Sequence, residues 1–162
     1  MDILSFEPAV AQLADALRRR SWRLVAAESC TGGLIAAACT ALAGSSDWFD
    51  RGFVTYSNEA KTEMLGVEAA LLVAGGAVSD AVAQAMVRGA LMRSRATLAV
   101  AVTGIAGPGG AVAGKPVGTV WLAWGTAQRV HAERLQLVGD RDAVRGAAVA
   151  AALQRLLQEA TA

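Results

Sequence analysis

The apolar positions of this chain recur at helical spacing in some stretches and form short continuous runs in others. In residues 6–20, Val10, Leu13 and Leu17 lie three or four positions apart, and the three arginines that follow favour a helix C-terminus. Similar reasoning predicts further helices at 31–44, 58–65, 78–95 and 140–158. Apolar and β-branched runs predict strands at 22–27, 52–57, 97–104, 117–125 and 129–137, the last two joined as a hairpin.

The order of these elements predicts one α/β domain over residues 1–162, with three layers (α/β/α) and a mixed β-sheet. Asn58 is the expected N-cap of the helix 58–65. In such sheets ligands bind beyond the carboxyl ends of strands. Three groups of polar or glycine residues fall at predicted strand ends: Ser29, the segment 56–61 and the segment 103–110. We therefore expect one site that these three segments share.

Composition narrows the class of protein. Of 162 residues, 54% are hydrophobic and 18% charged, which is enough for a well-packed core. The formal net charge of +1 argues against a surface that binds nucleic acid or an anionic membrane. The uncharged stretches between residues 28 and 47 and between 95 and 115 are broken by glycine, so neither is expected to span a membrane. The first ten residues lack a secretory pattern, and a cytoplasmic location is expected.

The cysteine and histidine content points away from a disulfide and from a metal site. Cys30 and Cys39 would be roughly 13 Å apart on a helix, beyond the ~7 Å that a disulfide tolerates, so both are expected to be free thiols. A single histidine, His131, and the absence of a CxxC motif argue against zinc. No metal is expected.

The octet AAESCTGG (26–33) lies where a predicted strand meets a predicted helix, and it has two readings. In one, Ser29 is a nucleophile, and the amides of Thr31, Gly32 and Gly33 stabilise developing negative charge at the helix N-terminus. In the other, Ser29 or Thr31 is an N-cap and the glycines allow close packing. Cys30 is a rival nucleophile, because thiols are intrinsically more reactive.

A nucleophilic serine needs a base, and the chain offers two candidates. His131 lies in a predicted hairpin strand and is expected at the surface or at a sheet edge. Lys61 follows a predicted strand end and can serve as the base if burial lowers its pKa. The competing reading makes Lys61 a solvated helix residue paired with Glu59 or Glu63.

A glycine-rich loop is expected at 105–115, after the strand 97–104. The amides of the segment VTGIAGPGG (102–110) can surround a phosphate or ribose there, with the Thr103 hydroxyl at the strand end, or the glycines can serve only a tight connection. Lys115 and Arg141 can add positive charge there, or can both lie on the surface. Trp121 and Trp124 are three positions apart and are expected on opposite faces of a strand. One of them is expected to face a partner subunit, and the chain is expected to form a homodimer.

Five stretches, in order and over nearly the whole chain, resemble the CinA C-terminal domain family: the segment 26–67, which contains ESCTGG, then GAVSDAVAQAMVRGAL, AVAVTGIAGPGG, KPVGTVWLAW and GDRDAVR. In bacteria this resemblance implies a nicotinamide-nucleotide amidase. The expected reaction hydrolyses the carboxamide of nicotinamide mononucleotide (NMN) to nicotinic acid mononucleotide and ammonia, with no metal or organic cofactor.

The resemblance assigns catalysis to Ser29 as nucleophile, with Lys61 and Tyr56 beside it. Lys61 is expected to take the serine proton and Tyr56 to relay a proton or orient Lys61. Glu28 is expected either to orient Lys61 or to pair with a surface arginine. The alternative function is a non-catalytic nucleotide-binding or regulatory domain of the competence/damage-inducible type. Residues expected to contact the substrate are Glu28, Cys30, Thr31, Gly32, Gly33, Asn58, Thr103, Gly104, Gly107, Gly109, Gly110 and Arg141.

Overall fold

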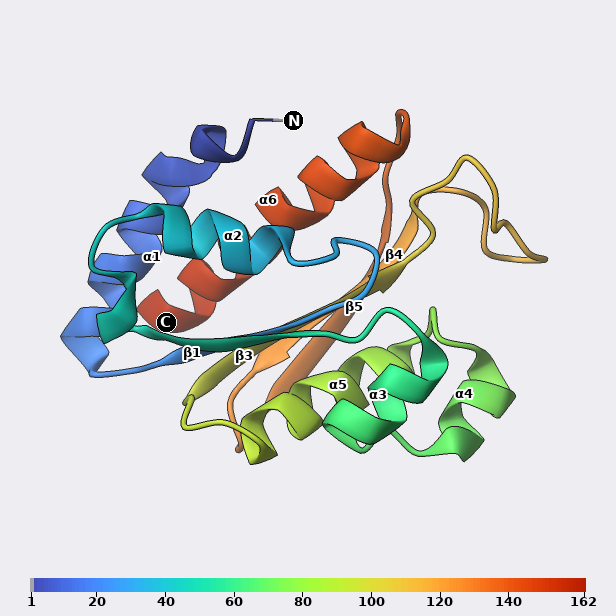
Figure 1. Ribbon diagram of the computed structural model, residues 1–162, viewed down its shortest axis with the longest axis horizontal. Coiled ribbons are helices and arrows are strands. Elements are labelled where there is room, and N and C mark those ends of the chain that lie inside the picture. The colour runs from blue at the N-terminus through green and yellow to red at the C-terminus, as the bar shows by residue number, and fades with distance from the viewer. Residues whose placement is uncertain (1) are drawn as a thin grey trace.

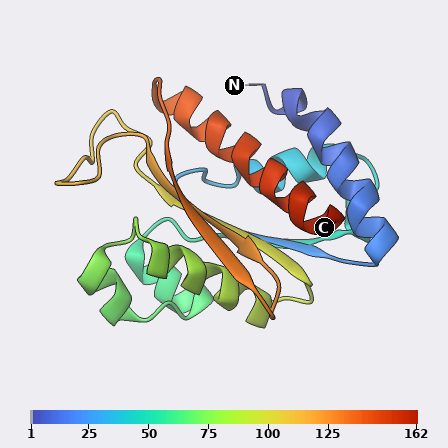
Figure 2. The ribbon, with the colours of Figure 1, turned by 180° about the vertical axis from the view of Figure 1, so that it is seen from behind.

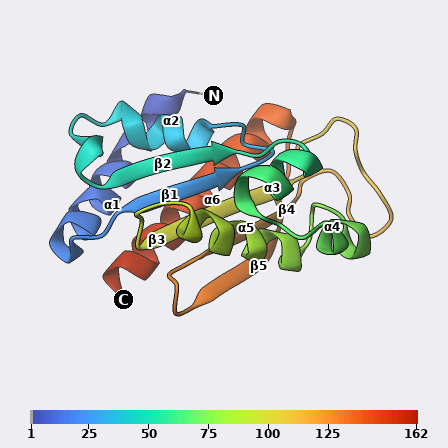
Figure 3. The same ribbon diagram turned by 60° about the horizontal axis from the view of Figure 1, so that its bottom comes forward.

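A five-stranded mixed sheet forms the middle layer of the protein in the computed structural model, which describes residues 2–162 (Figure 1). The strand order is β2-β1-β3-β4-β5. The two neighbours of β1, which are β2 and β3, run parallel to it, whereas β4 is antiparallel to β3 and β5 to β4 (Figure 3). The strands are β1 (Leu24–Glu28), β2 (Phe49–Val54), β3 (Leu98–Gly104), β4 (Thr119–Gly125) and β5 (Val130–Gln136).

Helices cover both faces of this sheet, which confirms the predicted three-layer α/β/α architecture (Figures 1 and 2). One face carries α1, α2 and α6, and the other carries α3 and α5, with α4 beside α5. The helices are α1 (Glu7–Arg20), α2 (Leu34–Ala41), α3 (Asn58–Leu65), α4 (Ala69–Gly75), α5 (Asp80–Met92) and α6 (Arg141–Thr161), with 3-10 turns η1 (Ile3–Phe6) and η2 (Ser45–Asp47).

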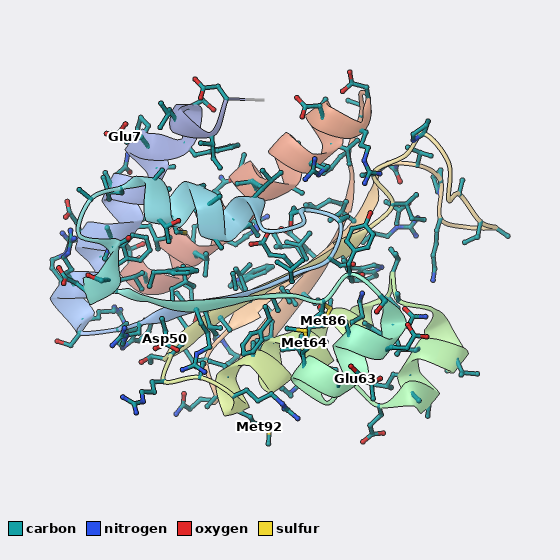
Figure 4. The ribbon with its side chains drawn as sticks, in the orientation of Figure 1. Glu7, Asp50, Glu63, Met64, Met86 and Met92 are labelled. Carbon is teal, nitrogen blue, oxygen red and sulfur yellow. The ribbon has the colours of Figure 1, made fainter. Side chains whose placement is uncertain are left out.

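The central strands supply apolar side chains to two separate cores, because successive side chains of a strand point to opposite faces. In β3, Val100 and Val102 pack with α1, α2 and α6, whereas Ala101 packs with α5. The same alternation directs Trp121 and Trp124 to different cores, as predicted. Within α5, the buried Met86 lies toward the sheet, while the exposed Met92 projects away from it (Figure 4). Among residues 2–162, no helix is both long and apolar enough to span a membrane.

The strand register brings the ends of the parallel strands level with one another. Glu28, the last residue of β1, pairs with Val54 in β2 and with Val102 in β3. The next residues continue the pattern: the Ser29 amide donates to the Val102 carbonyl, and the Thr55 amide donates to the Glu28 carbonyl. Ser29, Thr55 and Thr103 therefore emerge together at the carboxyl edge of the sheet. The sequence predicted this for Ser29 and Thr103, whereas Thr55 lay inside the predicted strand 52–57, because β2 ends three residues earlier than expected.

Several boundaries differ from those expected. Helix α2 begins at Leu34 rather than at residue 31, because Gly33 has a φ of 99°, which lies outside the helical region. The N-cap of α3 is Ser57, whose hydroxyl accepts from the Ala60 amide, so the expectation for Asn58 was wrong. Helix α4 was not predicted, since its apolar sequence AALLVAG has neither helical periodicity nor a side-chain cap.

Candidate active site

Ser29 and Lys61 lie in contact at the carboxyl edge of the sheet. Lys61 is one turn after the Ser57 cap of α3, and helical side chains lean toward the helix N-terminus, which here faces the strand ends. Its Nζ lies 3.0 Å from Ser29 Oγ and donates to the Thr55 carbonyl oxygen at 2.8 Å. Two residues far apart in sequence thus form a hydroxyl–amine pair.

Lys61 is buried, with only 1% of its surface exposed, although it lies in a short polar helix. Within the described chain no carboxylate pairs with it, so the expected ion pair with Glu59 or Glu63 is absent. Burial lowers the pKa of the Lys61 ammonium, since removal from water disfavours the charged form. The reading of Lys61 as a solvated surface lysine was therefore wrong, and the side chain has the environment of a lysine that acts as a base.

Glu28, the neighbour of the serine, caps helix α2. Its Oε2 accepts from the amides of Gly33 and Ile35, each at 3.1 Å, and its Oε1 accepts from the Ala36 amide at 2.9 Å. A buried carboxylate here satisfies amides that the first turn leaves unpaired and complements the helix dipole. Neither expected partner of Glu28, Lys61 or a surface arginine, is bonded to it.

This cap changes which amides near Ser29 are free. The Gly33 amide is bonded to Glu28, and the Gly32 amide donates to the Ser29 carbonyl at 3.0 Å. In the part of the chain that the structure describes, the amides of Cys30 and Thr31 make no hydrogen bond to a backbone carbonyl or to another side chain. The predicted donors Gly32 and Gly33 are thus occupied, whereas the Thr31 amide stays available and, within the described chain, the Cys30 amide interacts only with the thiol of its own side chain. Gly32 and Gly33 instead provide the positive φ values, 60° and 99°, that the turn requires.

A cavity of about 220 Å³ opens beside the serine–lysine pair. Of the residues predicted for the site, it brings together Ser29, Cys30, Tyr56, Lys61, Thr103, Gly104 and Arg141. The Tyr56 hydroxyl accepts from Arg141 Nη2 at 3.1 Å, and Arg141 Nη1 donates to the Gly107 carbonyl at 2.8 Å. Tyr56 is exposed, and its backbone carbonyl rather than its hydroxyl lies near Lys61 Nζ, at 3.4 Å.

Other predicted residues lie outside the wall of this cavity. Asn58 is exposed on α3, and Lys115 donates to the Gly75 carbonyl instead of reaching the site. The remaining residues absent from the lining are Glu28, Thr31, Gly32, Gly33, Gly107, Gly109 and Gly110. Whether the loop that contains the last three contacts a ligand remains a prediction.

Sequence reasoning missed the apolar wall and one arginine. Ala77, Val78 and Ala106 line the cavity, and the Thr103 hydroxyl holds the 77–78 segment by donating to the Ala77 carbonyl at 2.9 Å. Small apolar residues carry no chemical signal that could have identified them. Arg145 of α6 bonds to the turn after Ser29; it lies in the stretch GDRDAVR that supported the family resemblance, but nothing in that stretch indicated this contact.

The environments of the two cysteines and the histidine do not suit them to replace Ser29 or Lys61 in catalysis. Cys30 and Cys39 are free thiols, as predicted, and both are buried. Burial raises the pKa of the Cys30 thiol to about 11, so it is protonated at neutral pH. His131 stacks on Trp124 in the hairpin, with ring centroids 5.5 Å apart, and does not line the cavity. Residues 2–162 contain no cluster of three His, Cys, Asp or Glu side chains placed to hold a metal ion.

The fold and these contacts define a class of protein: a three-layer α/β domain with a serine–lysine pair in a cavity at the ends of its parallel strands. Residues 7–160 match the sequence model of the CinA C-terminal domain, and the chain belongs to this family. This confirms the resemblance noted from the sequence.

Named relatives and solved structures agree with the family. The chain is 56% identical, over 93% of its length and 94% of the relative's, to the nicotinamide-nucleotide amidohydrolase PncC of Pseudomonas putida. It is 52% identical to the protein of that name in Escherichia coli K12, over 91% of this chain and 90% of the relative. The solved structure of the competence/damage-inducible protein CihA from Agrobacterium tumefaciens superposes with a TM-score of 0.91 at 47% identity, covering 94% of each chain.

Proposed function

We propose that this protein hydrolyses the carboxamide of NMN to nicotinic acid mononucleotide and ammonia, through an acyl-enzyme on Ser29. The observation that carries the proposal is the 3.0 Å contact between Ser29 Oγ and Nζ of a buried lysine that has no anionic partner in the described chain. A neutral lysine at this distance can accept the serine proton. The substrate comes from the name of relatives that are more than 50% identical over most of the chain.

In the first step, Lys61 removes the Ser29 proton as Oγ bonds to the amide carbon of the substrate. The negative charge that develops on the amide oxygen needs preorganised donors. We assign this role to the amides of Cys30 and Thr31, because those of Gly32 and Gly33 are already bonded.

In the second step, the carbon–nitrogen bond breaks and Lys61 returns the proton to the departing ammonia. Tyr56 has two functions in the proposal: its backbone carbonyl helps to orient Lys61 Nζ, and its hydroxyl relays a proton at the cavity mouth. Water then attacks the acyl carbon as Lys61 takes one of its protons; the bond between the carbon and Ser29 Oγ breaks, Lys61 returns that proton to Oγ, and the carboxylic acid leaves. No atom or electron beyond substrate and water is required.

The cavity fits part of this substrate. Its volume of about 220 Å³ is smaller than the ~300 Å³ at the low end for drug-sized ligands, so the pyridine carboxamide enters and the phosphoribosyl group stays at the mouth. Arg141 is at that mouth, and its guanidinium can bind a phosphate. To do so it releases the Tyr56 hydroxyl, the Gly107 carbonyl or both.

The proposal also includes a cytoplasmic location and a homodimeric state. Static light scattering measures the oligomeric state.

The decisive experiment measures ammonia release from NMN by the purified protein and by its Ser29→Ala variant. We expect activity in the wild type and a loss of several orders of magnitude in kcat in the variant, as for nucleophile substitutions elsewhere. NMN binding without ammonia release would support the non-catalytic nucleotide-binding alternative.

Cys30→Ala is the matched control for Ser29→Ala. The Cys30 thiol is buried, with a raised pKa, so the variant is expected to keep near-normal turnover, and iodoacetamide is expected to leave the wild type active. If iodoacetamide abolished wild-type activity but spared Cys30→Ala, the nucleophile would be the cysteine.

A further inference from the structure

Arg145 bonds to the turn that carries the nucleophile. It lies on α6, and its guanidinium donates through Nε to the Cys30 carbonyl and through Nη2 to the Thr31 carbonyl, both at 3.1 Å. These are the two residues that follow Ser29 in the chain. One rigid planar group therefore holds two successive peptide units of the turn.

Peptide geometry converts these bonds into control over the neighbouring amides. The carbonyl of Cys30 and the amide of Thr31 belong to the same planar trans peptide and point in opposite directions. A guanidinium that fixes the Cys30 carbonyl therefore also fixes the direction of the Thr31 amide. By the same rule, its bond to the Thr31 carbonyl fixes the Gly32 amide, which donates to the Ser29 carbonyl.

Among the described residues, Arg145 forms no ion pair that would account for its position, although it is half-buried. Arg155, on the same helix, is the contrast: it forms a two-pronged ion pair with Glu133, with N–O distances of 2.7 and 2.8 Å. An arginine whose charge is balanced only by carbonyl dipoles is more costly to bury than a paired one.

The guanidinium of Arg145 also packs against the backbone of the turn at Gly32. A Cβ placed on Gly32 would lie 3.5 Å from Arg145 Nη2, so the turn rests directly on the guanidinium. The positive charge of Arg145 thus lies beside the turn whose amides bind the negatively charged substrate oxygen in the proposed reaction. A nearby fixed cation favours negative charge that develops there.

We propose that Arg145 is a positioning residue for the nucleophile turn: its guanidinium fixes the carbonyls of Cys30 and Thr31, and so holds Ser29 and the amides of these two residues in reactive geometry. This inference rests on the proposed function of Ser29. It adds a residue that touches neither the substrate cavity nor Lys61, but whose loss impairs the reaction through the turn.

The test compares Arg145→Met with Arg155→Met in steady-state kinetics on NMN. In Arg145→Met, kcat is expected to fall about 10- to 100-fold with KM little changed, because misplacing reacting groups by about 1 Å costs on that order. Arg155→Met also removes a bidentate interaction from α6, so it is expected to lower the melting temperature while leaving kcat unchanged. Arg145→Lys is expected to recover part of kcat, since an ammonium can bond to one of the two carbonyls.

A second readout is independent of the substrate. A fluorophosphonate probe reacts with an activated serine: a bond forms between Ser29 Oγ and phosphorus, the phosphorus–fluorine bond breaks, fluoride leaves, and Lys61 takes the proton. The labelling rate is expected to fall in Arg145→Met by a factor similar to that in kcat and to stay unchanged in Arg155→Met. Circular dichroism checks that each variant is folded.

The outcomes separate this inference from the proposed function. Labelling of the wild type without ammonia release from NMN would contradict the proposed substrate, and the labelling rates would still decide the role of Arg145. Wild-type kcat and labelling in Arg145→Met would overturn that role, as would an equal loss in both methionine variants. A wild type that is neither labelled nor active on NMN would overturn both proposals.

Discussion

Lys61 combines two properties that are rarely found together in a lysine: burial and the lack of an anionic partner in the described chain. Its Nζ instead contacts one hydroxyl and the carbonyl oxygens of residues 55–57. Such surroundings provide hydrogen-bond acceptors but little compensation for a full positive charge. The neutral amine is therefore favoured more than in water, and this is the form that the proposed reaction uses.

The pH dependence of activity follows from this shift. Burial lowers the pKa of Lys61, so kcat/KM for NMN is expected to rise with pH through that lowered pKa and to level off below the ordinary lysine value of about 10.4. A profile of kcat/KM against pH measures the rising limb. Between the lowered and the ordinary pKa the unfolded chain binds more protons than the folded one, so Lys61 also makes the free energy of unfolding increase with pH.

Two variants check the assignment of that limb. Lys61→Arg is expected to be inactive across the range, because a guanidinium stays protonated. Cys30→Ala is expected to keep the limb at the same pH. A limb that moved in Cys30→Ala but persisted in Lys61→Arg would assign the titration to the thiol.

The residues that face the cavity could be predicted from the sequence more readily than the residues that hold the surrounding turn in place. Ser29, Lys61 and Thr103 were found because each is a reactive or polar residue beside a predicted strand end. The roles of Glu28 and Arg145 could not be read in this way, since their partners are backbone amides and carbonyls. Every residue has such groups, and only the folded turn determines which are left unpaired.

At the scale of elements, the position of Lys61 depends on how α3 packs against α5. The backbones approach closely at Gly89 of α5, where a Cβ would lie 2.1 Å from the Leu65 carbonyl oxygen at the end of α3. Real atoms do not approach so closely, so a side chain here forces the two helices apart. A helical glycine is in this case required by close approach and not by its backbone conformation.

Gly89→Ala is expected to destabilise the protein by about 1–3 kcal/mol, because the added methyl group overpacks a backbone contact. A glycine-to-alanine substitution in a helix usually stabilises it instead, since alanine is about 1 kcal/mol more favourable than glycine. Urea unfolding measures the difference. Gly109→Ala is the control: a Cβ there meets nothing within 4 Å, and its stability is expected to be close to the wild type. A Gly89→Ala variant as stable as the wild type would contradict the contact.

The elements themselves were largely predictable, whereas their ends were not. The strand 97–104 and the helix 58–65 match β3 and α3 because their sequences have strong strand and helix preferences. Helix α2 started three residues later than expected, since the Glu28 carboxylate places the first helical amides and Gly33 adopts a positive φ. That carboxylate lies outside the helix, in the preceding strand, so no local pattern in 31–44 contained the information.

At the scale of the whole molecule, one sheet separates two cores that share their strands. Residues of β1 and β3 alternate between the two cores. Loss of packing in one core therefore disturbs the strands on which the other core is built. Each face nevertheless contains a tryptophan that can report on it. Trp48 is fully buried in the core of α1, α2 and α6, and Trp121 packs against the core of α5.

The two cores are therefore expected to unfold in one transition. In variants that keep only Trp48 or only Trp121, with the other tryptophans replaced by phenylalanine, urea midpoints measured by fluorescence should each coincide with the midpoint measured by circular dichroism in the same variant. The far-ultraviolet signal follows all helices and acts as the internal control. Separate midpoints by fluorescence and circular dichroism in either variant would show that one face unfolds first.

The arginines of α6 also set the time at which the site is complete during synthesis. Ser29 and Lys61 leave the ribosome long before Arg141 and Arg145, which belong to the final helix. At translation rates of about 5–20 residues per second, the interval is on the order of ten seconds. During that time a nascent chain contains the serine and the lysine without the guanidinium groups that hold the turn and the cavity mouth. In the proposed reaction, full activity therefore requires that α6 has docked onto the turn that follows Ser29.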